Sequence, residues 1–189
     1  VFTRPGGSGK FLPAVKKENF RGELRFKAKY RHRGVAIEGA VSYENVAAMI
    51  DYLPKNGYNS YFLQFDNSYE FFERWYLHKN NEKLAPEAFD INEIYHKVVS
   101  EIKKRNLILH SVGHGWTAKA VGCDVTGWDK HECEKDNELL ALVNGKRKYF
   151  KDVPSNTNLC YSNPAAQEAF ANCVADYAEN HPETDVLHV

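Results

Sequence analysis

The sequence predicts an α/β fold, namely the first half of a TIM-type (β/α)8 barrel with about four parallel strands and flanking helices. Four short apolar runs alternate with helix-forming segments, which is typical of successive βα units in a parallel sheet. A complete barrel of eight units takes about 250 residues, whereas this chain has 189. The sequence stops on an apolar strand with no helix to cover it, so we expect a truncated barrel.

The amino-terminal residues 1–30 are expected to be a lead-in or linker from a preceding domain, and residues 31–189 the amino-terminal half of the barrel. The segment 4–9 (Arg-Pro-Gly-Gly-Ser-Gly) has loop composition, and residues 16–29 are charged with few apolar positions. The first strand is predicted at 34–38. A helix capped by Ser42 follows it and ends near Pro54 and Gly57.

The second strand is predicted at 60–65, and an aromatic-rich segment, 67–89, follows it. Asp90 begins the next helix, whose apolar positions recur at helical spacing. The third strand is predicted at 107–112, ahead of a long insertion over 113–161. Asn163 and Pro164 then open a helix, and the fourth strand is predicted at 185–189.

Composition excludes several classes of partner and indicates a compartment. The formal net charge is zero, so bulk charge predicts neither a nucleic-acid partner nor an anionic membrane. No run of about 18 apolar residues is present, so no membrane-spanning helix is expected. The four cysteines are too few for a disulfide-built scaffold, and we expect reduced thiols and a cytoplasmic protein.

Candidate functional residues follow from the rule that barrel enzymes carry their sites at the carboxyl ends of the strands and in the loops beyond them. Glu38 stands at the carboxyl end of the first predicted strand, and Asp66 follows the second. The remaining candidates belong to the third and fourth strands and their loops: His110, His114, Trp116 and His188.

Several short segments, in order, resemble the domain-of-unknown-function 4838 family. They are residues 31–40 (RHRGVAIEGA), Phe65-Asp66, residues 110–116 (HSVGHGW) and residues 159–164 (LCYSNP). That family looks like a (β/α)-barrel glycosidase related in style to α-glucuronidases and hexosaminidases, and the resemblance covers roughly residues 30–189.

The resemblance implies a cleft for an oligosaccharide or polysaccharide. In it Arg33 and Glu38 would meet sugar hydroxyls or a carboxylate, Asp66 would accept hydrogen bonds, and Trp116 would stack on a sugar ring. Glycoside hydrolysis needs two carboxylates, which the resemblance places beyond the last residue. The parent protein is therefore expected to be the hydrolase, and this chain alone to be inactive, with no cofactor.

Two other functions stay open. His110-x-x-x-His114 with Asp66 upstream resembles the metal site of polysaccharide deacetylases, where a divalent ion such as zinc activates water. That family has a second Asp where this chain has Asn67. The other alternative is a non-catalytic carbohydrate-binding module. A half barrel also exposes unpaired strand edges, so we expect self-association or contact with the missing barrel half.

Overall fold

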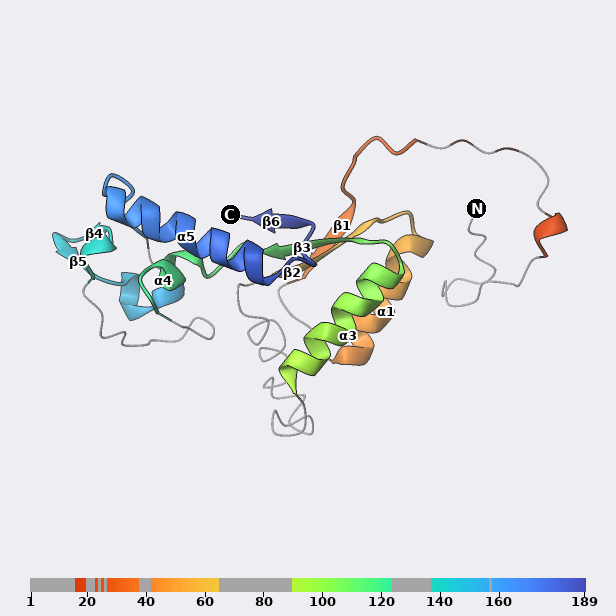
Figure 1. The fold of residues 1–189 in the computed structure, drawn as a ribbon, viewed down its shortest axis with the longest axis horizontal. Coiled ribbons are helices and arrows are strands. Elements are labelled where there is room, and N and C mark those ends of the chain that lie inside the picture. Colours follow the sequence, from red (N-terminus) through yellow and green to blue (C-terminus); the bar gives the residue numbers. More distant parts are fainter. Residues whose placement is uncertain are drawn as a thin grey trace.

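The structure is a computed structural model, which describes residues 16–19, 23, 25, 27–37, 42–64, 90–123, 137–156 and 158–189. Its centre is a parallel sheet with strand order β1-β2-β3-β6 (Figure 1). The bounds of these strands are β1 Gly34–Ile37, β2 Ser60–Gln64, β3 Ile108–Val112 and β6 Val186–His188. The predicted α/β fold with a parallel sheet and flanking helices is confirmed.

Helices connect the strands, and each longer helix begins where a capping side chain was predicted. The helices are α1 Tyr43–Lys55, α3 Ile91–Lys104, α4 Trp116–Ala120 and α5 Pro164–Asn180. Ser42 accepts a hydrogen bond from the Asn45 N–H, and Asp90 accepts from the N–H groups of Asn92 and Glu93. These bonds satisfy N–H groups that have no partner inside a helix, so they fix where α1 and α3 start.

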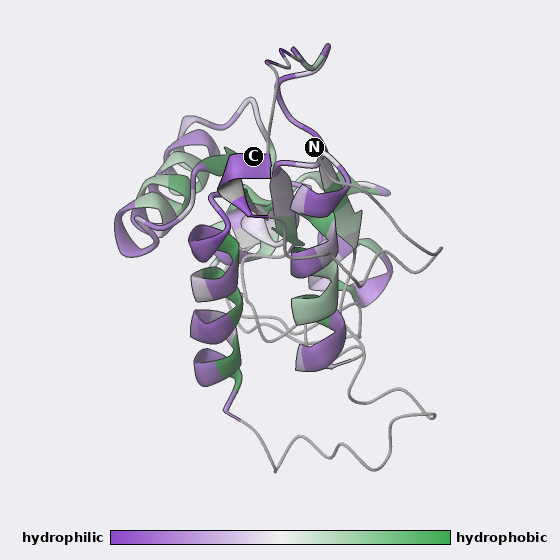
Figure 2. Ribbon diagram, turned by 90° about the vertical axis from the view of Figure 1, so that its right-hand side faces the viewer, coloured by the Kyte–Doolittle hydropathy of each residue, from purple (hydrophilic) through white to green (hydrophobic). Residues whose placement is uncertain are grey.

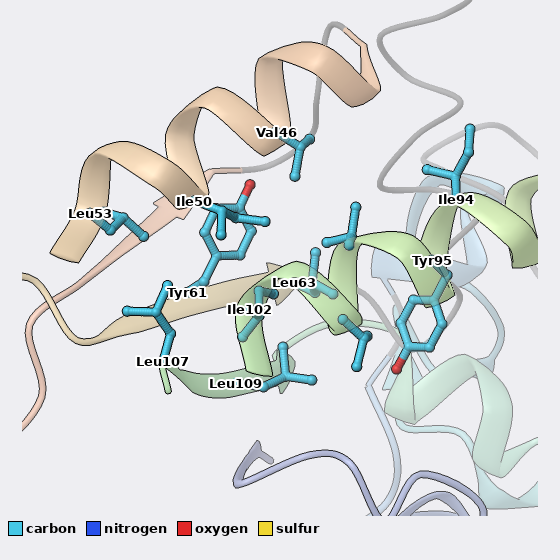
Figure 3. Packing of buried hydrophobic residues seen from close by; sticks show 12 residues of the cluster. Val46, Ile50, Leu53, Tyr61, Leu63, Ile94, Tyr95, Ile102, Leu107 and Leu109 are labelled. Atoms are coloured by element: carbon cyan, nitrogen blue, oxygen red, sulfur yellow. The ribbon is translucent and has the colours of Figure 1, made fainter. Parts of the chain in front are cut away.

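The main hydrophobic core lies between the sheet and the pair α1 and α3, which run on the same side of it (Figure 1). Ile50 of α1 and Ile102 of α3 are fully buried against Tyr61 of β2 and Leu109 of β3 (Figure 3). Hydrophilic residues occupy the outward side of these helices (Figure 2). This amphipathic pattern is the one that the sequence predicted, and burial of the apolar side stabilises the layer.

The insertion predicted over 113–161 builds a second, smaller core instead of a plain loop. It contains α4, a two-stranded antiparallel sheet and several short 3-10 turns. Their bounds are β4 Leu142–Val143, β5 Lys146–Arg147, η4 Asn137–Leu139, η5 Phe150–Asp152 and η6 Pro154–Asn156. A further 3-10 turn, η1 Lys17–Asn19, lies in the predicted lead-in. Leu140 and Leu159 are buried beside Ala118 of α4 and Ala166 of α5, so these segments pack on the last long helix.

One cysteine of this smaller core corrects a prediction. Cys123 is 2% exposed and disulfide-bonded, while Cys160 and Cys173 carry thiols. The expectation of reduced thiols throughout is therefore wrong at Cys123. Because disulfides persist mainly in oxidising compartments, the bond at Cys123 removes the reason for predicting a cytoplasmic setting. None of the helices in the described ranges has the length and apolar character needed to cross a bilayer.

Candidate functional site

The sheet has one face covered by helices and one that stays partly exposed. Along a strand, successive side chains point to opposite faces. Tyr61 and Leu109 are buried on the helix-covered face, whereas the residues that follow them, Phe62 and His110, are half-buried on the other. We call this second face the open face, and it comprises Ala36, Phe62, His110, Val186 and His188.

Three histidines form a hydrogen-bonded chain on the open face. His110 Nδ1 lies 2.8 Å from His188 Nε2, and His110 Nε2 lies 3.2 Å from Nδ1 of His32, which precedes β1. The ring of Phe62 lies beside that of His188, with centroids 4.6 Å apart. A neutral imidazole has one N–H donor and one acceptor nitrogen. His110 therefore donates to one neighbour and accepts from the other, and the chain can pass a proton along its length.

The surroundings of His110 favour its neutral form. Burial lowers the pKa of His110 first, and repulsion from His188 and His32 lowers it further, while Asp185 acts in the opposite direction. The Asp185 carboxylate is itself engaged, because it accepts hydrogen bonds from Lys103 Nζ at 2.6 Å and from the Leu109 N–H at 2.7 Å. Both ring nitrogens of His110 contact other imidazoles, so its neutral form serves to connect His32 and His188 through one donor and one acceptor.

Of the residues predicted from the sequence, the structure brings His110 and His188 into direct contact. Trp116 is next to them, since its indole N–H donates to the His188 carbonyl at 2.8 Å. His114 is exposed in the loop after β3, between Gly113 and Gly115. Glu38 and Asp66 lie outside the described residues.

Two of the expected roles do not fit the positions found. Trp116 is 4% exposed and packs edge-on against Tyr177, so in this position it has no free face for a sugar ring. The Arg33 guanidinium lies at the amino end of β1, whereas the saccharide site was predicted at the carboxyl ends of the strands. It donates to the carbonyls of Gly57 at 2.8 Å and Tyr30 at 2.5 Å. Arg33 thus holds backbone segments together.

The deacetylase-like metal site is also not formed in the part of the chain that the structure describes. No three His, Cys, Asp or Glu side chains in those ranges gather around one point. Both ring nitrogens of His110 contact other imidazoles, so His110 has no free lone pair for a metal without losing a neighbour. Asp66, the third expected ligand, is among the residues not described.

His32 was not predicted from the sequence as a site residue. It precedes β1, so a rule that selects the carboxyl ends of strands passes over it. His32 lies in the segment 31–40, which was singled out from the sequence, but only Arg33 and Glu38 were selected from that segment. Its contact with His110, 78 residues away, depends on tertiary structure.

Comparisons with known proteins give no match: no family model, no curated protein and no solved structure resembles this chain significantly.

Proposed function

We propose that this chain is the substrate-facing half of a (β/α)-barrel glycoside hydrolase, with the cleaving carboxylates lying mostly outside it. The observation that carries the proposal is the open face of the sheet, where imidazoles and an aromatic ring gather. Sugars offer C–H faces to rings and hydroxyls to polar groups. The rings of Phe62 and His110, and Nδ1 of His188, which has no hydrogen-bond partner among the described residues, supply both kinds of contact.

The strand order supports the barrel. Each new strand is added beside the previous one, in the order β1-β2-β3-β6, and parallel crossovers are almost always right-handed. When each strand is added on the same side of the previous one and every crossover has the same hand, the connecting helices of the described sheet lie on one side of it. In doubly wound folds the order reverses and both faces are covered. In a barrel the uncovered face becomes the interior, with functional groups at the carboxyl ends.

The segments 31–40, 110–116 and 159–164, with Phe65-Asp66, are the sequence observation behind the same class, although no family model matches the chain. In this proposal His110, His188 and His114 contact the saccharide, and Glu38 and Asp66 join them from the ends of the first two strands. Trp116 takes a different part from the one first expected. Its bond to the His188 carbonyl makes it a positioning residue for β6.

Binding of neutral oligosaccharides tests the proposal. Titration of the chain with cello-, xylo- and malto-oligosaccharides is expected to shift the NMR signals of His110 and His188. His188→Gln should weaken binding about tenfold, the effect of one lost hydrogen bond to a ligand. His96→Gln, on the exposed side of α3, is the control and should bind normally. Absence of any shift at millimolar sugar would contradict the proposal.

Turnover separates the proposal from its alternatives. The chain alone should not cleave aryl-glycosides, and the protein with its catalytic carboxylates should. Activity of the chain alone on acetylated polysaccharide that a chelator abolishes would favour the deacetylase instead. Saccharide binding with no glycosidase activity in any longer form of the protein would favour a non-catalytic binding module.

The two edge strands of the sheet are able to pair with strands of another chain. In the described sheet, β1 and β6 each pair with one neighbour only, so each has an edge of backbone groups able to bond another strand. We propose that these edges mediate self-association or contact with the other half of the barrel. Sedimentation of a stable monomer at micromolar concentration would contradict this.

A further inference from the structure

A cavity lies at the amino end of the sheet, away from the carboxyl ends considered above. Its volume is about 500 Å³, and β3 and β6 begin beside it. Polar and charged side chains provide much of its lining: Arg31, His32, Asn59, Lys103, Asn106 and Asp185. Cavities of roughly 300–1,000 Å³ are the usual size for small-molecule sites.

The charges in this cavity do not cancel. Lys103 and Asp185 form an ion pair with Nζ and Oδ2 2.6 Å apart, so their charges offset each other. The Arg31 guanidinium has no hydrogen-bond or ion-pair partner within the described ranges. A guanidinium always carries its charge and presents five donors. The cavity therefore has one excess positive charge before any histidine is protonated.

The backbone that carries Arg31 is held in place. Asn59 Nδ2 donates to the Arg31 carbonyl at 2.8 Å, and Asn59 Oδ1 accepts from the Arg33 N–H at 2.8 Å. These two bonds clamp the segment before β1 onto the turn before β2. A fixed backbone lowers the entropy lost when a side chain is ordered by a ligand.

His32 can offer an N–H to an anion without disturbing the histidine chain. Its Nδ1 contacts His110 Nε2, which leaves its own Nε2 for another partner. With its proton on Nε2, His32 accepts at Nδ1 from His110 Nε2, and His110 accepts at Nδ1 from His188 Nε2. Every hydrogen bond in the chain is then satisfied, and an N–H remains for an anion.

We propose that this cavity binds a small oxyanion, a phosphate or carboxylate group carried by a small molecule, through the Arg31 guanidinium and an N–H of the His32 ring. The cavity adjoins the proposed saccharide face at His32, whose Nδ1 lies 3.2 Å from His110 Nε2, but anion binding there does not depend on saccharide binding. Guanidinium pairs with phosphate and carboxylate in a two-pronged geometry, and Asn59 and Asn106 offer amide donors to the rest of the ligand.

Titration with sulfate and with acetate, followed by the NMR signals of the Arg31 side chain and the Asn59 and Asn106 amides, tests the site. Saturable shifts are expected. Arg31→Gln should weaken binding at least tenfold, because it removes a charge-assisted pair. Arg25→Gln should leave the binding unchanged, because the Arg25 side chain is 88% exposed and does not line the cavity. Tighter binding of sulfate indicates a phosphate-type ligand, and tighter binding of acetate a carboxylate.

The His32 ring is the second test, and sulfate is the probe. The charged and polar groups that face His32 are Arg31, the Lys103–Asp185 pair, His110 and His188. His32→Gln should weaken sulfate binding, because it removes the ring N–H offered to the anion, and His96→Gln, on the exposed side of α3, should bind normally. Equal binding of sulfate by the unmodified chain and by either Arg31→Gln or His32→Gln would overturn the proposal.

Discussion

The loss of stability on replacement of Trp116 by alanine tests whether Trp116 is a core residue or a residue that stacks on a sugar ring. The indole is 4% exposed, lies edge-on to Tyr177 with ring centroids 5.4 Å apart, and donates to the His188 carbonyl. Truncation of a buried tryptophan to alanine costs about 3–5 kcal/mol. We expect a loss in this range in the free energy of unfolding, and α5 and β6 to loosen together, because Trp116 contacts both.

The assay is urea or guanidinium denaturation at neutral pH, with hydrogen exchange of the β6 amides as the local readout. Trp116→Phe keeps an aromatic ring but removes the N–H donor, so it should cost about 1–2 kcal/mol. Tyr30→Ala is the control, since Tyr30 is 65% exposed and surface changes usually stay within about 0.5 kcal/mol. A Trp116→Ala variant with less than about 1 kcal/mol of destabilisation would refute the assignment of Trp116 to the core.

Two further predictions concern β3 and β1. Because the pKa of His110 is lowered in the folded chain, the unfolded chain binds more protons below about pH 6.5, so stability should fall as the pH drops from 8 to 5. Denaturation midpoints should show a smaller fall in His110→Gln, and an equal fall would show that other groups are responsible. At Gly34 an added Cβ would stand 2.3 Å from Ser60 Oγ and 2.9 Å from the Ser60 carbonyl oxygen. Gly34→Ala should therefore destabilise by about 1–3 kcal/mol, measured by thermal unfolding, and a Tm equal to that of the unmodified chain would contradict this reading.

The elements with strong periodic or capping signals were predictable from the sequence. Ser42, Asp90 and Asn163 cap the helices as expected, because capping depends on atoms only two or three residues away. The strands were predicted at 34–38, 60–65, 107–112 and 185–189, and each predicted bound lies within a residue or two of the observed one. Local chemistry decided these features.

The features that the sequence did not predict depend on distant contacts. The insertion lacks a periodic apolar pattern, so its packing around Leu140 and Leu159 could not be foreseen. Trp116 follows a glycine-rich stretch typical of a loop, yet Gly115 adopts a φ of 107° and the chain turns at once into α4. The histidine chain joins residues from three segments that are far apart in the sequence. No local sequence pattern predicts a contact of this kind.

The order in which the strands join has a consequence for how the chain acquires its structure. Gly34 pairs with Ser60, Ser60 with Ile108, and His110 with Val186, so each pairing closes a longer loop than the one before it. Loop closure costs more entropy as the loop lengthens, and contacts distant in sequence slow folding. The first two βα units should therefore assemble early, as the chain leaves the ribosome, while β6 docks last and completes the histidine chain only at the end.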